Sequence, residues 1–308
     1  MKQLINVDEL NLNRITNILD LSKALLDSDG EKYNSLCLGK ILSIVFLNES
    51  LRTSAILKAA MYKLGGNIIE VSNYVDESSL DVFNSILPLS DLSAIRADYV
   101  EFDDLNSRFN VPLINSLCYR DEHSLSSLWH LLTMDILLNG IKGKKVGLYG
   151  QTAHCRPYLS LQKLLSKVGC DFYIDPVMDE LGNPNVVDDY IVSNGASITK
   201  CNIADFISKV DVLLISDGQP MGGSNNDDNQ LLLEYSKRYK VFDEKLINKL
   251  PDHAIANYMM PRKLVDERST IDESILNHEK FYNSKMMDFG VYSTMALIID
   301  ILGLSCDV

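Results

Sequence analysis

The chain has 308 residues, of which 46% are hydrophobic and 23% are charged, and its formal net charge is -13 at pH 7. This acidic charge argues against a nucleic-acid partner and against binding to an anionic membrane surface. No apolar run approaches the length of a membrane span. The length suits two domains, each with its own core. Because the first residues also lack a signal-peptide pattern, we expect a two-domain cytoplasmic protein.

Six cysteines are spread along the chain without a C-x-x-C pair or a cluster of histidines and cysteines. This pattern is typical of reduced thiols in a cytoplasmic protein and argues against a structural zinc site. The glycines of VGLYGQ (146–151) follow an apolar run but do not form G-x-G-x-x-G, so a nicotinamide site has little support. We therefore expect neither a metal site nor a cofactor.

Short apolar runs predict four strands in the first part of the chain, at 41–47, 67–72, 97–102 and 111–116. A helical pattern at 53–65 separates the first two strands and ends at a pair of glycines, as helices often do. Strands that alternate with helices form a parallel sheet covered on both faces. The first part therefore predicts an α/β domain.

A long amphipathic helix at 123–140 leads into a second alternating series. A polar, turn-rich stretch at 218–230 follows the last strand of this series, at the sheet edge where open α/β sheets bind ligands. An apolar helix is expected at 289–304. The strands of the second series are predicted at 144–150, 170–176, 196–200 and 211–217, and its helices at 157–169, 184–195 and 202–209. The pattern predicts two parallel-sheet α/β domains joined by the helix at 123–140.

The stretch FLNESLRT (46–53) places Ser50, Arg52 and Thr53 just ahead of a helical pattern. A helix N-terminus presents free backbone N–H groups and the positive end of the helix dipole, and both attract phosphate. Hydroxyl donors and a planar guanidinium group also suit phosphate oxygens. On these residues alone, a helix cap beside a solvated arginine is the commoner explanation.

Five motifs in order extend this observation over nearly the whole chain. The pattern F-x-x-x-S-x-R-T at 46–53, with LGGNIIEVS after the helix, resembles the carbamoyl-phosphate signature of the aspartate/ornithine carbamoyltransferase family. The later motifs of that family resemble DEHSLSSL (121–128), CRPYLSL (155–161), SDGQPMGG (216–223) and MMPR (259–262). The chain is identified as a divergent member of this family.

The resemblance implies a carbamoyltransferase-like fold and an activity. Residues 1–130 would form a carbamoyl-phosphate domain, against which a C-terminal helix at 287–308 packs, and residues 131–286 would form the amino-acid-binding domain. The enzyme would move a carbamoyl group from carbamoyl phosphate to an amine of an amino acid. The resemblance also implies a homotrimer whose other partners are small-molecule substrates.

The resemblance further implies roles for residues at the donor site. Arg52 and Thr53 would bind the phosphate and, with His123, contact the carbonyl oxygen, which makes these three the expected catalytic residues. Two backbone carbonyl groups near the end of the second domain would hold the amine group of the donor. The complete set of donor-binding residues implied in this way is Ser50, Arg52, Thr53, His123, Met260 and Pro261.

At the acceptor site the resemblance points to Arg156, Asp217 and Gln219. Arg156 stands where aspartate enzymes hold the α-carboxylate of the acceptor. A carboxylate at Asp217 would repel a second carboxylate and suit an ammonium group, which indicates a diamino acid such as ornithine. Gln219 matches a glutamine of the aspartate enzymes, so aspartate stays open as the acceptor.

Several positions depart from the family pattern in ways that weaken a phosphate site. Leu51 replaces a hydroxyl residue, Ser126 replaces a glutamine, and Glu101 corresponds to a phosphate-binding arginine. No Lys or Arg lies between Lys63 and Arg96, the stretch from which a neighbouring subunit would supply a cation. Exchanging a cation for an anion beside phosphate changes the pair energy by several kcal/mol at an effective dielectric of about 20. Replacement cations would have to come from Arg96, Arg108 or Arg120.

Two alternatives follow from this loss of cations. The first is a non-catalytic or ligand-sensing homologue that keeps the fold and the acceptor pocket. The second is an enzyme that uses a donor other than carbamoyl phosphate.

Overall fold

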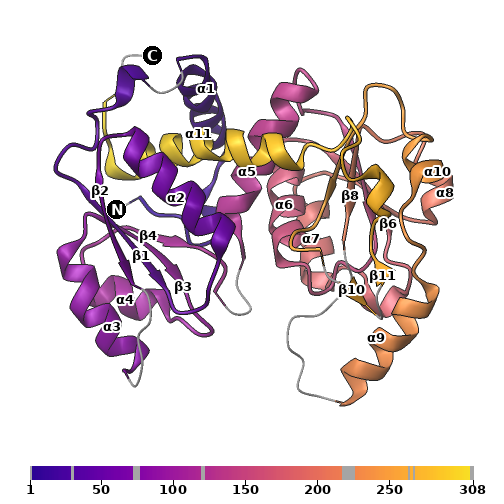
Figure 1. Cartoon of the computed structure of the whole chain (residues 1–308), viewed down its shortest axis with the longest axis horizontal. Coiled ribbons are helices and arrows are strands. Elements are labelled where there is room, and N and C mark those ends of the chain that lie inside the picture. Colours follow the sequence, from indigo (N-terminus) through magenta and orange to yellow (C-terminus); the bar gives the residue numbers. More distant parts are fainter. Residues whose placement is uncertain are drawn as a thin grey trace. The chain divides into compact units, whose positions relative to one another are not determined.

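The computed structural model describes residues 2–28, 31–71, 77–118, 122–216, 226–262, 264–265 and 268–305. The chain divides into two compact units (Figure 1), Met1–Leu132 with Met286–Val308, and Thr133–Lys285. Helix α5 (Ser124–Leu137) begins in the first unit and ends in the second, and α11 (Asn283–Leu302) does the reverse. The two units are thus connected by continuous helices.

The first unit is built on a parallel four-stranded sheet with the order β2-β1-β3-β4. Figure 1 shows α3 and α4 on one side of this sheet and α2 on the other. Buried side chains of β1, β3 and β4 form a core with those of α3 and α4. The elements are β1 (Ile41–Phe46), β2 (Asn67–Val71), β3 (Leu92–Arg96), β4 (Leu113–Asn115), α1 (Leu12–Asp27), α2 (Leu51–Lys63), α3 (Ser79–Ile86) and α4 (Phe102–Arg108).

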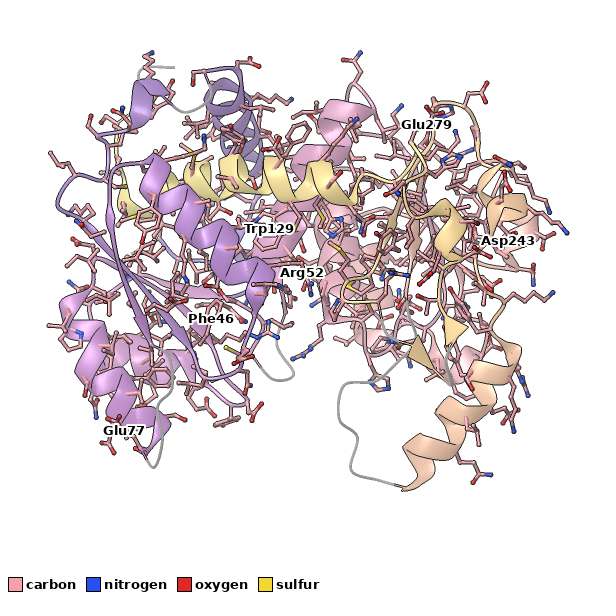
Figure 2. The ribbon with its side chains drawn as sticks, in the orientation of Figure 1. Phe46, Arg52, Glu77, Trp129, Asp243 and Glu279 are labelled. Carbon is pink, nitrogen blue, oxygen red and sulfur yellow. The ribbon has the colours of Figure 1, made fainter. Side chains whose placement is uncertain are left out.

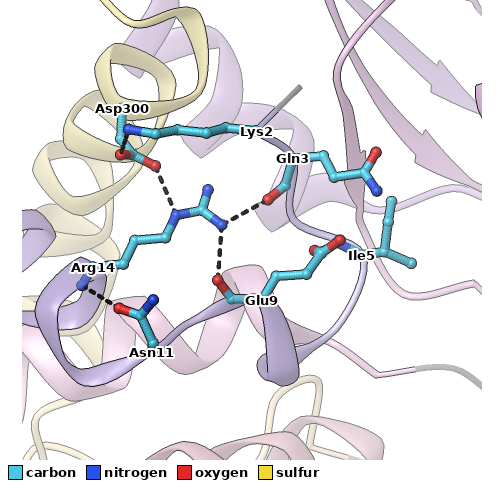
Figure 3. A network of polar contacts seen from close by, with 7 residues as sticks. All are labelled: Lys2, Gln3, Ile5, Glu9, Asn11, Arg14 and Asp300. Atoms are coloured by element: carbon cyan, nitrogen blue, oxygen red, sulfur yellow. Dashed lines mark hydrogen bonds and ion pairs between the residues drawn. The ribbon is translucent and has the colours of Figure 1, made fainter.

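The N-terminal segment is tied to the first unit by a polar network (Figure 3). Arg14 of α1 donates from Nε to Asp300 Oδ2 of α11 at 2.8 Å and from Nη1 to the carbonyl oxygens of Gln3 and Glu9 at 2.9 and 3.0 Å. Lys2 Nζ pairs with the other oxygen of Asp300 at 2.7 Å. These contacts hold the segment beside β4, where Leu4 forms a parallel bridge with Ile114.

The second unit contains a parallel five-stranded sheet with the order β7-β6-β5-β8-β9. Its core joins β5 and β8 to aromatic residues such as Phe206 and Phe242. A two-stranded antiparallel pair, β10 (Leu264–Val265) and β11 (Arg268–Ser269), follows the last strand of the large sheet. The other elements are β5 (Lys145–Tyr149), β6 (Asp171–Asp175), β7 (Ile198–Lys200), β8 (Val212–Ile215), β9 (Ile255–Tyr258), α6 (Arg156–Lys167), α7 (Asn185–Ser193), α8 (Ile203–Phe206), α9 (Asn226–Arg238) and α10 (Glu244–Ile247).

The prediction of two parallel-sheet α/β domains is confirmed, but one of the predicted strands is wrong. The strand expected at 97–102 lies at Leu92–Arg96, and Phe102 begins α4 instead. Asp103 and Asp104 in the first turn of α4 complement the positive end of the helix dipole, which favours a helix at this point. Of the turn-rich stretch expected at 218–230, residues 218–225 lie outside the described residues, and α9 begins at Asn226.

Short 3-10 helices occur at Val7–Glu9, Glu31–Tyr33, Leu87–Leu89, Asp179–Leu181 and Glu273–Ile275. Within the described ranges, none of the helices combines the length and the apolar character needed to cross a membrane. In the part of the chain that the structure describes, five cysteines are free thiols, and four of these are buried.

Candidate functional site

The start of α2 is open to a ligand. Ser50 occupies the N-cap position in an extended conformation, but its side chain makes no capping bond to the helix backbone. The Ser50 hydroxyl instead donates to Thr53 Oγ1 at 2.9 Å, and Thr53 is 3% exposed. The explanation of Ser50 as an ordinary side-chain cap is therefore wrong. The first backbone N–H groups of the helix keep their capacity to bind an anion.

Arg52 supplies a positive charge at the same helix end, as Figure 2 shows. Its side chain is half-buried, and this burial lowers the pKa of the guanidinium from its ordinary value. A cation that has lost part of its hydration gains from a bound anion, which restores favourable interactions. The side chains on either side of Ser50 point into solvent: Glu49 is exposed and Leu51 is 83% exposed.

A second arginine lies at the carboxyl end of β3. Arg96 is paired in register with Phe46, the last residue of β1, and its carbonyl oxygen accepts the N–H of Leu47 at 2.7 Å. Its Nη1 donates to the carbonyl oxygen of Ser116 at 3.3 Å. Parallel strands place their carboxyl ends at one edge, so Arg96 lies beside the connection that leads from β1 into α2.

The other charged positions singled out in the sequence lie elsewhere in the first unit. Glu101 is the N-cap residue of α4, beyond the end of β3, and its side chain is exposed. Arg108 is exposed and forms an ion pair with Asp104 at 3.0 Å within α4. Arg120 lies outside the described residues. Of the two candidate replacement cations that the structure describes, Arg96 is thus the one at the carboxyl edge of the sheet.

His123 immediately precedes α5 and is 5% exposed. Its ring meets the ring of Trp129 in an edge arrangement with centroids 6.0 Å apart, and Trp129 Nε1 donates to Thr294 Oγ1 of α11 at 2.9 Å. The Ser126 hydroxyl donates to the carbonyl oxygen of His123 at 2.9 Å. These contacts give the His123 ring a defined place at the start of the helix.

The predicted acceptor residue Arg156 is the first residue of α6 in the second unit, and its side chain is partly buried. The connection between β5 and α6 is held by Tyr235, whose hydroxyl accepts the N–H of Gln151 at 3.0 Å. Gln151 Oε1 in turn accepts the N–H of His154 at 3.1 Å. The other two predicted acceptor residues, Asp217 and Gln219, lie outside the described residues.

Met260 and Pro261 follow β9 in the second unit and are joined by a cis peptide bond. The end of β9 is anchored by Asn283, which donates from Nδ2 to the carbonyl oxygen of Tyr258 at 2.8 Å and accepts the N–H of Tyr258 at 3.3 Å. Met260 and Pro261 thus follow a strand end that is held in place by Asn283.

The two parallel sheets and the open helix N-terminus with its arginine define an α/β protein whose first unit suits an anion. Residues 2–135 match the aspartate/ornithine carbamoyltransferase, carbamoyl-P binding domain. The chain is 28% identical over 310 residues to the aspartate carbamoyltransferase catalytic subunit of Finegoldia magna, with 98% of both chains covered. The chain is thus similar to aspartate/ornithine carbamoyltransferases, in its first part through the carbamoyl-P binding domain and along its length through this relative.

Solved structures show the same fold. The catalytic subunit of M. jannaschii aspartate transcarbamoylase is 23% identical, with a TM-score of 0.83 and 98% of both chains covered. The aspartate transcarbamoylase from Trypanosoma cruzi in complex with carbamoyl phosphate is 21% identical, with a TM-score of 0.85 over 97% of this chain and 96% of that one.

Proposed function

We propose that the protein is a carbamoyltransferase that moves a carbamoyl group from carbamoyl phosphate to an amine of an amino acid. The observation that carries this proposal is the uncapped start of α2, where the Ser50 and Thr53 hydroxyls meet beside the half-buried Arg52. Arg96 at the end of β3 adds the positive charge that the sequence pattern lacked at Glu101. The match of residues 2–135 to a carbamoyl-P binding domain supports the same donor.

The chemistry gives each donor residue a task. The amine nitrogen forms a bond to the carbonyl carbon, the carbon–oxygen bond to phosphate breaks, and the proton that the amine loses leaves with the phosphate. Arg52, Thr53 and His123 would donate to the carbonyl oxygen, where negative charge develops in the tetrahedral transition state. Ser50 and Arg96 would join them in neutralising the departing phosphate. On the family resemblance, the carbonyl groups of Met260 and Pro261 would accept from the donor's amine group.

The acceptor would be bound by Arg156 through its α-carboxylate. An anion at the start of α6 is also favoured by the helix dipole. Asp217 suits an acceptor with a second ammonium group, such as ornithine, whereas Gln219 and the relatives named aspartate carbamoyltransferase favour aspartate. We therefore propose an amino-acid acceptor of one of these two kinds.

Calorimetric titration of the protein tests this function. We expect heat of binding with carbamoyl phosphate, and tighter binding of a phosphonacetyl bisubstrate analogue, because such a ligand joins the donor and acceptor contacts in one molecule. Analogues built on aspartate and on ornithine would separate the two acceptors, since the tighter one identifies the amino acid. A folded protein that binds neither carbamoyl phosphate nor either analogue would contradict the proposal.

The family resemblance also leads us to propose a homotrimer. An apolar stripe on α2 supports self-association, because the exposed Leu51, Ala55 and Tyr62 recur at helical spacing with the partly buried Ala59. Leu51 and Tyr62 are 83% and 63% exposed, and large exposed apolar side chains grouped on one helix face often mark interfaces. Sedimentation equilibrium should give the mass of three chains, and a mass of one chain would exclude the trimer.

A further inference from the structure

The connection that follows β4 contains a residue in a costly backbone conformation. Leu117 has a φ of 83°, in the left-handed region that residues with a side chain seldom adopt. Unlike most positions of this kind, it is not a glycine, so the local sequence does not favour the turn by itself. Such a conformation persists only where surrounding contacts impose it, and these positions gather at functional sites.

Asn115, the last residue of β4, imposes this turn. Its Oδ1 accepts the N–H groups of Leu117 at 3.0 Å and of Cys118 at 2.9 Å. Its Nδ2 donates to the carbonyl oxygen of Ile5 at 3.0 Å, and the residue is fully buried. The Asn115 side-chain amide is therefore fixed by the N-terminal segment through its nitrogen, and it stabilises the turn through its oxygen.

Ser116 lies between Asn115 and the strained residue, and it connects the turn to Arg96. The Ser116 N–H donates to the carbonyl oxygen of Ile95 at 2.8 Å. Its carbonyl oxygen accepts from Arg96 Nη1 at 3.3 Å. The direction of that carbonyl depends on the peptide between Ser116 and Leu117, and so on the left-handed conformation of Leu117.

We propose that Asn115 is a positioning residue for the donor site. It keeps Leu117 in the left-handed turn, which aims the Ser116 carbonyl group at Arg96 and fixes the guanidinium for the phosphate of carbamoyl phosphate. This inference rests on the proposed function for its ligand. The contacts from Asn115 to Arg96 all lie within the first unit.

The substitution Asn115→Ala tests the proposal through a rescue. We expect it to raise the KM for carbamoyl phosphate about tenfold, the factor that corresponds to the left-handed penalty of a non-glycine residue. The kcat should stay within about twofold, and so should the KM for the acceptor. In Asn115→Ala/Leu117→Gly the KM should return to within about threefold of the wild type, because glycine adopts the turn without the amide.

Two further variants change the turn at Leu117 itself. Leu117→Gly alone should leave the donor KM within about twofold of the wild type, since Asn115 is intact. Leu117→Ile should raise it several-fold, because a β-branched residue tolerates a positive φ least. These variants keep the proposal testable if Asn115→Ala does not fold. Asn17→Ala, an exposed change on α1, is the matched control and should not alter the KM.

Hydrogen–deuterium exchange separates the positioning role from the proposed function. The peptide that spans 113–118 should exchange about tenfold faster in Asn115→Ala and slow again in the double variant, with or without a ligand. A donor KM that is unchanged in Asn115→Ala, or that glycine does not rescue, would overturn the proposal. If the wild type does not bind carbamoyl phosphate, the proposed function fails. Exchange that glycine restores would then still show that Asn115 controls the turn.

Discussion

Replacing Arg52 by glutamine is expected to lower kcat/KM for carbamoyl phosphate by about 10²- to 10³-fold, the usual loss when a group that stabilises developing negative charge is removed. The guanidinium is half-buried and burial lowers its pKa, so it interacts with an anion more strongly than a fully hydrated arginine would. Steady-state kinetics with the preferred acceptor at saturation measure the effect. Arg52→Lys should keep part of the activity, because it retains the charge but loses the planar fork.

The chain offers a matched control for this change. Arg108→Gln removes the same kind of side chain from the first unit, but Arg108 is exposed and its partner is Asp104 on the same helix. This variant should stay within about twofold of the wild type. Equal losses in the two variants would mean that Arg52 contributes only to general surface charge, and its proposed contact with the donor would be withdrawn.

Replacing Gly150 by alanine is expected to destabilise the second unit by about 2–4 kcal/mol, from a strained backbone and an overpacked strand end. Gly150 follows β5 with a φ of 95°. An added Cβ would lie 2.5 Å from the carbonyl oxygen of Ser216 and 2.9 Å from the hydroxyl of Tyr235. The Ser216 carbonyl belongs to the backbone after β8, so it can move only if that strand end also moves. Urea titration followed by circular dichroism gives the change in the free energy of unfolding.

Gly195→Ala separates the contribution of backbone strain from that of overpacking. Gly195 has a similar φ of 83°, but nothing lies within 4 Å of its added Cβ. This variant should lose only the conformational part, about 1 kcal/mol. If both variants lower the free energy of unfolding equally, the crowding of the added Cβ between the ends of β5 and β8 makes no contribution to the loss.

The sequence by itself was sufficient for the two parallel sheets, because their central strands, such as β1, β3 and β8, are largely buried and the strands stand out as short apolar runs. Seven of the eight strands predicted in the two series, for example those at 41–47 and 211–217, overlap observed strands. The error at 97–102 has a physical cause. Ala97, Tyr99 and Val100 are apolar enough to suggest a strand, whereas the pairing of Phe46 with Arg96 ends β3 before them.

The same error explains why the sequence pattern pointed to a donor site that lacked one of its expected arginines. The resemblance to the family motif placed Glu101 in the position of a phosphate-binding arginine, although the register between strands decides which side chain lies at the edge of a sheet. In the observed register Arg96 is the last residue of β3, and Glu101 is the N-cap residue of α4. Arg52, Ser50 and Thr53 could be proposed from sequence because they are neighbours along the chain and begin a helix.

The turn at Leu117 had no sequence signal, since a residue with a positive φ is normally marked by glycine or asparagine. Its conformation depends on Asn115, whose side chain donates to the carbonyl oxygen of Ile5, a residue distant in the chain. Local patterns therefore determined the elements, their order and the helix start that suits a phosphate. Only the tertiary structure decided which arginine stands at the sheet edge and how its partner carbonyl is aimed, because both depend on contacts between residues distant in the chain.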